Sequence, residues 1–325
     1  MKQPKKILIY VYEDLLGDSI LKLPFVYAVR NLFPKAHITW CAGGGKSMYA
    51  SALAPLVNQA LDKIIEVPVG RSWKELLSAS FFKAQFFDLI VDTQRDLKTT
   101  LILKKTPHQA FISRTARFFF SDFKPRKDQK KGAHLSKQLI FLLEVFSGKT
   151  IKSPPFKRTL FKPFQKEVQK VFPKNKSYIG FAPGAGNQKK CWPIDRFTQV
   201  AKEIEKQGKI AVFILGPAEK SWYRSLKKNL PKALFPLQET PVLLSNPFYT
   251  SALGFFLESV VVNDAGVAHL LSLSDTKIIS LFGPTKAEKV HPLAKKLTLI
   301  KASDFQSDCM SDIPIQPVLN ALKSI

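Results

Sequence analysis

The clearest chemical signal in the chain is the loop Pro183–Lys190, in which small residues stand beside two lysines. An apolar strand is predicted just before this loop, and a helix is predicted to begin after it at Trp192–Pro193. Free backbone N–H groups in such a loop and the positive N-terminal end of a helix attract anions, and Lys189 and Lys190 add full charges. The loop is therefore a candidate seat for a phosphate or diphosphate, although an ordinary turn with solvated lysines explains the same residues equally well. The small residues that would approach the ligand are Gly184, Ala185 and Gly186.

Three further loops in the same half of the chain follow predicted strands. Glu219 could accept hydrogen bonds from ribose hydroxyls, Asp264 and Gly266 could hold a ligand oxyanion or ribose, and His269 stands one helical turn later. Gly283–Thr285 closes another strand. Each residue also has a simpler interpretation, because acidic residues favour helix starts and a lone helical histidine usually packs in the interior. The carboxyl ends of parallel strands share one edge of a sheet, so four such loops together favour a nucleotide-type ligand.

The N-terminal half offers a candidate base and a false nucleotide motif. Asp18 follows the first predicted strand and could act as a general base on an incoming hydroxyl, although capping of the next helix is an alternative. The polar run Asp92–Arg95 ends another strand, at the position where open α/β sheets place ligand contacts. The turn Gly43–Ser47 resembles a P-loop at first sight. A P-loop needs a glycine where Trp40 stands, so this motif is rejected.

Alternating apolar strands and amphipathic helices must position these residues. Two such series imply an α/β fold with two Rossmann-like, doubly wound domains that face a cleft. We expect an N-terminal domain over residues 1–160, a basic linker over 161–176 and a C-terminal domain over 177–325. The predicted strands cover 6–12, 37–41, 63–67, 87–92, 109–112, 178–182, 210–215, 259–263, 277–282 and 297–300. The predicted helices cover about 17–32, 73–83, 134–146, 193–206, the segment from 219, 266–273 and 317–325.

The charge of the chain points to an anionic partner. The 325 residues include 50 Lys and Arg against 25 Asp and Glu, and residues 101–174 alone carry 18 against 4. Nucleic acid, an anionic membrane surface or a phosphorylated glycolipid would each suit this charge, and a general lysine bias is the plain alternative. No zinc-finger, RNA-recognition or helix-turn-helix signature supports nucleic acid.

Composition bounds the setting of the protein. No apolar run approaches the roughly 18 residues of a membrane-spanning helix. The three cysteines are scattered at Cys41, Cys191 and Cys309, which argues against a disulfide framework and against a zinc cluster. We therefore expect a cytosolic protein.

In combination, the motifs resemble those of the ADP-heptose:lipopolysaccharide heptosyltransferases. These are inverting glycosyltransferases with two Rossmann-like domains, the architecture called GT-B. The resemblance runs across nearly the whole chain, and its motifs are specific only together. They are GDS at 17–19, FDLIVDTQ at 87–94, PGAGNQKKCWP at 183–193, LGPAEK at 215–220, NDAGVAHL at 263–270 and LFGPT at 281–285.

The resemblance implies a role for each candidate residue. Asp18 matches the aspartate proposed to deprotonate the acceptor hydroxyl, and Lys190 matches the lysine that contacts the donor's diphosphate or sugar. Glu219 matches the acid near the donor ribose. The donor loop is matched by Asp264, Gly266 and His269, with Ala265 where the family usually has Thr or Ser.

The resemblance also implies the substrates and the place of action. The donor would be ADP-heptose or a similar nucleotide-sugar, used without a cofactor or metal, and the acceptor would be the inner core of lipopolysaccharide, either Kdo-lipid A or a heptosyl acceptor. Such an anionic glycolipid would bring the enzyme into peripheral contact with the cytoplasmic face of the inner membrane. The alternatives are a transferase for another nucleotide-sugar or glycan, a non-catalytic glycolipid-binding relative, and, on charge alone, a nucleic-acid-binding protein.

Overall fold

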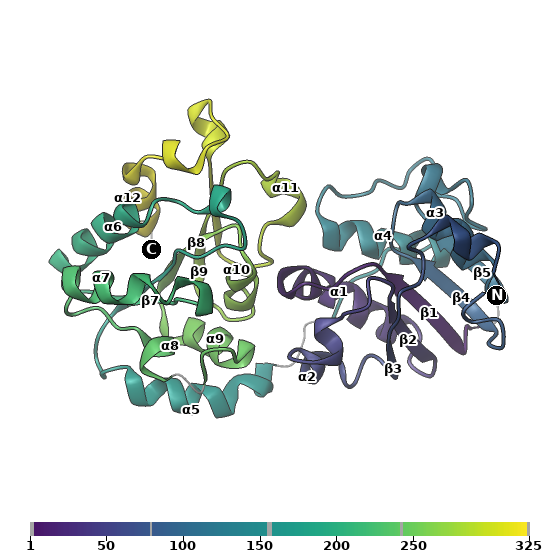
Figure 1. The fold of residues 1–325 in the computed structure, drawn as a ribbon, viewed down its shortest axis with the longest axis horizontal. Helices are drawn as coiled ribbons and strands as arrows, with labels where there is room; N and C mark the ends of the chain where they lie inside the picture. The colour runs from purple at the N-terminus through teal and green to yellow at the C-terminus, as the bar shows by residue number, and fades with distance from the viewer. Residues whose placement is uncertain (1–2, 79, 155–157, 241–242, 324–325) are drawn as a thin grey trace. The chain divides into compact units, whose positions relative to one another are not determined.

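The chain folds into two compact units, Met1–Phe156 and Lys157–Ile325, in the computed structural model. The structure describes residues 3–78, 80–154, 158–240 and 243–323. Each unit is built around one parallel five-stranded sheet with helices on its faces (Figure 1). This confirms the predicted α/β class with two Rossmann-like halves.

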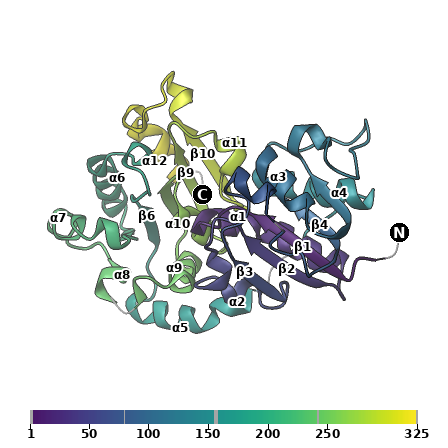
Figure 2. The same cartoon turned by 45° about the vertical axis from the view of Figure 1, so that its right-hand side comes forward.

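The sheet of the first unit has the strand order β3-β2-β1-β4-β5, and all its pairs are parallel. The labels of β3, β2, β1 and β4 follow this order in Figure 2. The chain runs from β1 outward to β3 and then crosses back to β4, so the order reverses between β1 and β4. In open α/β sheets, ligands bind at such a reversal, beyond the carboxyl ends of the strands. The strands are β1 (Lys6–Val11), β2 (His37–Ala42), β3 (Lys63–Glu66), β4 (Phe87–Asp92) and β5 (His108–Ser113).

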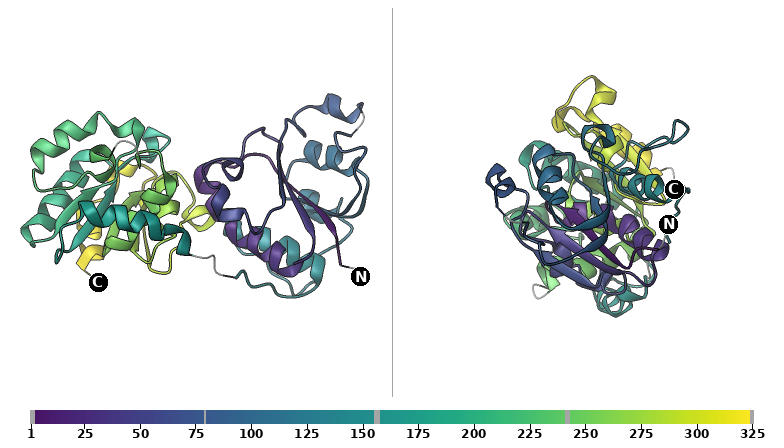
Figure 3. Two further views of the ribbon diagram at one scale, coloured as in Figure 1. Left: turned by 90° about the horizontal axis from the view of Figure 1, so that it is seen from below. Right: turned by 90° about the vertical axis from the view of Figure 1, so that its right-hand side faces the viewer.

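Helices α1 (Leu16–Leu32) and α4 (Leu135–Ser147) pack against each other beside the first sheet (Figure 3, left). Both helices form as predicted, but neither has the exposed polar face expected of an amphipathic helix: only Asn31 is exposed in α1 and only Lys137 in α4. Helix α1 continues through Pro24 as one helix. The first unit also contains the short helices α2 (Ala54–Val57) and α3 (Leu97–Lys104).

The prediction of a helix over residues 73–83 is wrong: among the described residues of this span, helical structure is limited to one 3₁₀ turn at Trp73–Leu76. A capping box between Ser72 and Glu75 starts it correctly. The Lys105 ammonium then donates to the carbonyl oxygens of Glu75, Leu76 and Ser78. Because the Lys105 ammonium takes the place of the backbone N–H groups that would bond these carbonyls in a helix, the helix ends after one turn.

The second sheet has the order β10-β9-β8-β6-β7, again with all pairs parallel. Here the reversal lies between β6 and β8, which pair directly. The expected ligand edge of this unit is therefore formed by the loops that leave β6 and β8. The strands are β6 (Tyr178–Ala182), β7 (Ile210–Phe213), β8 (Ser259–Asn263), β9 (Lys277–Phe282) and β10 (Leu297–Lys301).

Alternate residues of the buried strand β6 supply the two hydrophobic cores of the second unit. Ile179 and Phe181 face one core with residues of α6, α7 and α12, while Tyr178 and Ala182 face the other with residues of α5, α9 and α10. This two-residue period is that of a strand covered on both faces. The helices of this unit are α5 (Lys162–Val171), α6 (Ile194–Lys206), α7 (Trp222–Asn229), α8 (Pro236–Glu239), α9 (Pro247–Leu253), α10 (Gly266–Leu271), α11 (Ala287–Val290) and α12 (Ile315–Lys323).

The segment predicted as a linker over residues 161–176 is largely helix α5 and belongs to the second unit. Val168 is fully buried in the core, with Phe164 and Val171 packed against the same cluster. These three apolar residues recur at helical spacing, but the surrounding lysines and Pro163 concealed the pattern. Pro163 sits in the first turn of the helix, where proline is tolerated.

No helix in the described part of the chain has both the length and the apolar character needed to cross a membrane.

Candidate functional site

Two residues predicted from separate loops meet at the reversal point of the second sheet. The Lys190 ammonium lies 2.7 Å from Oδ2 of Asp264, although the residues are 74 positions apart in sequence. Lys190 follows β6 and Asp264 follows β8, the two strands between which the order reverses. The Asp264 side chain is 8% exposed and that of Lys190 is 34% exposed. A nearly buried carboxylate thus holds a lysine whose charge reaches solvent.

Glu219 brings a third loop to the same place. Its carboxylate group lies against two glycines, because a Cβ atom built on Gly184 would be 2.4 Å from the Glu219 Cδ, and one on Gly216 would be 2.8 Å from Oε2. The acid can occupy this position only because both neighbours lack side chains. Burial, followed by the nearby Glu219 charge, raises the pKa of the Cys191 thiol, which stands next to Lys190 in the chain. Three of the four loops predicted to share this edge, those after β6, β7 and β8, therefore lie together.

Asn263 is a site residue that the sequence analysis missed. It is fully buried at the end of β8, where its Oδ1 accepts from the Trp192 backbone N–H at 3.2 Å. Its Nδ2 donates to the Pro183 carbonyl at 2.6 Å. One amide therefore fastens both ends of the Pro183–Lys190 loop to the neighbouring strand. The available signal was a polar residue ending the apolar run SVVVN, since a buried amide must find partners.

The remaining residues of the predicted donor loop lie at the start of α10. Ala265 is the N-cap residue and makes no side-chain capping bond, Gly266 is the first helical residue, and His269 is buried within the helix. The capping alternative for Asp264 is wrong, because Asp264 precedes the cap and pairs with Lys190 instead. In the β6 loop, Gly186 is exposed, and an added Cβ there would meet no atom within 4 Å. The half-buried Ala185 lies beside it.

Asp18 lies in the first turn of α1 in the first unit, directly beyond the carboxyl end of β1. The cap of that helix is Leu15, so the interpretation of Asp18 as the N-cap is wrong. The loop that leads to it is anchored by the buried Asp14, whose carboxylate accepts from the Trp40 indole at 2.6 Å and the Ser47 hydroxyl at 2.9 Å. The Lys22 ammonium pairs with Asp14 as well. These contacts fix the start of α1 and hence the position of Asp18.

Asp92, at the end of β4, is completely buried. Its carboxylate accepts from the Thr100 hydroxyl at 2.6 Å, the Ser113 hydroxyl at 2.8 Å and the Gln94 N–H at 2.9 Å. Burial raises its pKa to about 6, against these three hydrogen bonds, which favour the charged form. The residue that the sequence placed at a ligand edge thus ties β4 to α3 and β5.

Two parallel sheets, each with candidate residues beyond the strand ends at a reversal of strand order, define the GT-B architecture. The chain belongs to glycosyltransferase family 9 (heptosyltransferase), whose model matches residues 78–314. It is therefore a glycosyltransferase.

Individual proteins agree with this assignment. Lipooligosaccharide heptosyltransferase 2 of Campylobacter jejuni subsp. jejuni serotype O:2 is 25% identical, and the alignment covers 95% of each chain. The structure of E. coli heptosyltransferase WaaC with ADP superimposes with a TM-score of 0.67 at 16% identity, covering 98% of this chain and 99% of WaaC. The structure of E. coli ADP-heptose lps heptosyltransferase II gives a TM-score of 0.65 at 17% identity, covering 98% of both chains. At these identities the two structures establish the shared fold.

Proposed function

We propose that this protein is an inverting heptosyltransferase that moves a heptose from ADP-heptose to the inner core of lipopolysaccharide. The observation that carries the proposal is the Lys190–Asp264 pair, with Glu219 beside it, at the reversal point of the second sheet. Family membership supports the reaction class. The names of the E. coli relatives, one solved with ADP and one called an ADP-heptose enzyme, support the donor.

The donor end of the reaction is assigned to the second unit. Lys190 contacts the diphosphate of the donor, and Asp264 holds the lysine in place through the 2.7 Å pair. Glu219 accepts hydrogen bonds from the ribose hydroxyls. The backbone of the β6 loop and the start of α10 complete the donor site through Gly184, Ala185, Gly186, Ala265, Gly266 and His269.

The acceptor end is assigned to Asp18. The acceptor hydroxyl oxygen attacks the anomeric carbon of the donor while Asp18 takes the hydroxyl proton. The bond between that carbon and the diphosphate oxygen breaks, and its electron pair leaves with ADP. Lys190 stabilises the negative charge that develops on the leaving oxygen. A single displacement inverts the anomeric configuration, and we expect it to proceed without a cofactor or metal.

The acceptor also suggests where the enzyme works. An inner-core glycolipid is anchored in a membrane, so we propose a cytoplasmic enzyme in peripheral contact with the inner face of the inner membrane. The excess of 50 Lys and Arg over 25 Asp and Glu suits an anionic lipid surface.

The test is transfer from ADP-heptose to a Kdo-terminated lipid A acceptor, with the product detected by mass spectrometry. We expect a product heavier by one heptose, and Asp18→Ala should lower kcat about a hundredfold or more. A product formed only from a different nucleotide-sugar would show that the protein is a transferase with a donor other than ADP-heptose. ADP binding without any transfer would favour the non-catalytic relative, and Asp18→Ala with normal turnover would remove Asp18 from the role of base.

A further inference from the structure

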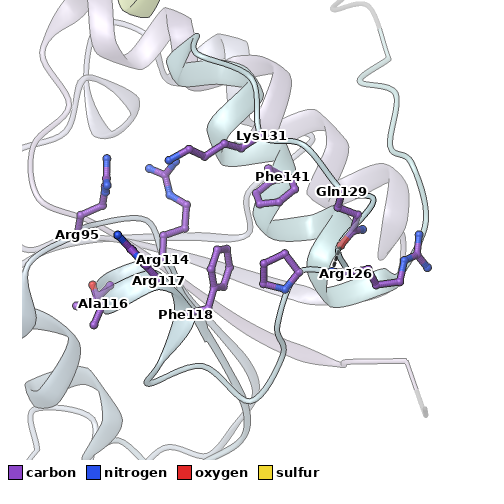
Figure 4. Close-up of a pocket in the computed structure, with 11 residues that line it drawn as sticks. Arg95, Arg114, Ala116, Arg117, Phe118, Arg126, Gln129, Lys131 and Phe141 are labelled. Carbon is purple, nitrogen blue, oxygen red and sulfur yellow. Dashed lines mark hydrogen bonds between the residues drawn. The ribbon is translucent and has the colours of Figure 1, made fainter.

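The first unit contains a strongly basic pocket, and none of its lining residues has a role in the reaction steps described above. It has a volume of about 450 Å³ and is lined by residues from the end of β4, the turn after β5, the segment before α4, and α4 itself. Its cations are Arg95, Arg114, Arg117, Arg126 and Lys131, and none of the described lining residues is acidic. Figure 4 shows Arg95, Arg114 and Arg117 gathered at one end, with Phe118 and Phe141 farther along the wall.

Arg114 is the most unusual of these side chains because it is 92% buried, being only 8% exposed. One guanidinium nitrogen donates to the Gln138 amide oxygen at 2.6 Å. Its Nε is buried without a hydrogen-bond partner among the residues that the structure describes. Burial, and then the like charge of Arg95, lowers the pKa of Arg114 to about 10, so the group stays charged at neutral pH. A buried charge held by a neutral amide alone is costly.

The charge of Asp92 does not neutralise Arg114. Asp92 raises the pKa of Arg114, but its effect is smaller than those of burial and of the Arg95 charge, which lower it. Its carboxylate is already engaged by Thr100, Ser113 and the Gln94 N–H. Within the described ranges, the only ion pair of a pocket cation is that between Arg126 and Asp128 at 3.4 Å, which is largely exposed. The pocket therefore holds an excess of positive charge.

The backbone of the pocket wall is strained in a way that positions a cation. Ala116, Arg117 and Phe118 are consecutive non-glycine residues with φ values of 47°, 55° and 67°. Left-handed backbone is unfavourable for residues other than glycine, and such strain often accompanies ligand sites. This turn places Arg117 on the pocket wall, while Phe118 packs edge-on against Phe141 with ring centroids 6.1 Å apart.

We propose that this pocket binds the phosphate monoester group of a phosphorylated sugar. A phosphate monoester carries nearly two negative charges and three acceptor oxygens, which match the Arg114 Nε and the guanidinium groups of Arg95 and Arg117 better than a single carboxylate does. The pocket is larger than a phosphate, and the remaining space beside Phe118 and Phe141 suits a sugar ring. A soluble sugar phosphate and a phosphorylated glycolipid present the same group. Identifying the ligand as the glycolipid acceptor rests on the proposed function, whereas phosphate binding does not.

The pocket is tested by calorimetry on the full chain with glucose 6-phosphate, inorganic phosphate and uncharged glucose. We expect the sugar phosphate to bind and glucose not to bind, with saturating ADP leaving the affinity unchanged because donor binding is assigned to the other unit. Arg117→Ala and Arg114→Gln should each weaken sugar phosphate binding about tenfold or more, the effect of losing a charged hydrogen bond. Arg224→Ala removes an exposed arginine of the second unit and serves as the matched control.

Arg117 is exposed, so Arg117→Ala keeps the test valid if Arg114→Gln fails to fold. Absence of phosphate binding, equal binding of glucose and its phosphate, or binding unchanged in both pocket variants would overturn the proposal. Vesicles with and without phosphorylated lipid A then distinguish the two sources of the phosphate. If the protein binds only the vesicles with phosphorylated lipid A, and Arg117→Ala abolishes this binding, the ligand is the glycolipid. If the protein binds the free sugar phosphate but neither kind of vesicle, the ligand is soluble. If the protein binds the sugar phosphate but transfers no heptose, the proposal for the pocket is supported and the proposed function is contradicted.

Discussion

At the scale of single residues, the contrast between Lys189 and Lys190 shows how position separates two identical side chains. Lys189 is exposed, whereas Lys190 is held 2.7 Å from the nearly buried Asp264. Removing Lys190 has two expected consequences. In the proposed mechanism, the developing charge on the leaving group loses its stabilising cation. In the fold, Asp264 is left as an unpaired, nearly buried charge.

We therefore expect Lys190→Ala to lower kcat for heptose transfer by about a hundredfold, as loss of a transition-state donor does, while Lys189→Ala stays near the wild-type rate. The second consequence is separated by Lys190→Ala combined with Asp264→Asn, which should recover thermal stability without recovering activity. Steady-state kinetics and thermal unfolding measure the two effects. Equal activities for the two lysine variants would contradict the assignment of Lys190.

Asp92 gives a pH dependence whose sign follows from its burial. Because the pKa is raised from 3.8 to about 6 in the folded state, folding favours the protonated form, and the resulting stabilisation is present below about pH 4 and is lost as the pH rises through 6. Relative to Asp92→Asn, the wild type should lose up to about 3 kcal/mol of unfolding free energy between pH 4 and pH 7. Urea unfolding of both proteins across this range measures the difference. Parallel pH profiles would show that Asp92 does not titrate as described.

At the scale of elements, the β6 loop depends on glycines that leave room for the Glu219 carboxylate. Gly184→Ala would place a Cβ 2.4 Å from the Glu219 Cδ, so the acid must move away from its present place. We expect this substitution to weaken ADP binding about tenfold, the effect of losing a hydrogen bond from a ribose hydroxyl to a charged carboxylate. In a Glu219→Ala background the same substitution should have little further effect. Calorimetry measures the affinity for ADP of the two single variants and the double variant. If the losses in binding free energy are additive, Gly184 acts independently of Glu219.

The order of elements could be predicted from sequence because most strands are short apolar runs that end in recognisable turn residues. The convergence of loops after β6, β7 and β8 followed from the parallel sheet alone. Helix α5 could not be recognised, since lysines and Pro163 diluted its apolar spacing. The shortening of the helix at Trp73 depends on Lys105, a contact across about 30 residues that no local pattern contains.

Side-chain geometry at the sites was less predictable than the loops that carry it. The sequence placed Lys190 and Asp264 at one edge, but their direct pairing depends on which strands are neighbours. Asn263 looked like a strand end. Arg114 and Arg117 were hidden in a generally basic stretch, and the left-handed turn that positions Arg117 contains no glycine to mark it.

At the scale of the whole molecule, charge and exposed apolar groups together suit a membrane surface. The formal net charge is +25, and the stretch after β3 exposes Trp73 by 55%, Leu77 by 92% and Phe81 by 58%. Basic residues attract anionic lipid over a distance limited by salt, while apolar side chains enter the interface after contact.

We expect the protein to sediment with anionic vesicles, less so as salt rises from about 0.05 to 0.5 M, and not with neutral vesicles. Replacement of Trp73 and Leu77 by serine should reduce binding, whereas Leu293→Ser, a partly exposed apolar position of the second unit, should not. Binding that is unchanged by salt and by the double substitution would contradict the proposed surface. Tight, salt-dependent binding to duplex DNA without any vesicle binding would favour the nucleic-acid alternative.

The three cysteines differ in exposure, and this gives the protein its own labelling sites. Cys309 is exposed, Cys191 is half-buried in the loop beside Lys190, and Cys41 is buried with a pKa raised by burial to about 12. A maleimide dye should therefore attach first at Cys309, then slowly at Cys191, and leave Cys41 unmodified, because thiolates are the reactive form. With Cys309→Ser, a fluorophore on Cys191 would sit next to Lys190, and we expect its emission to change when ADP binds.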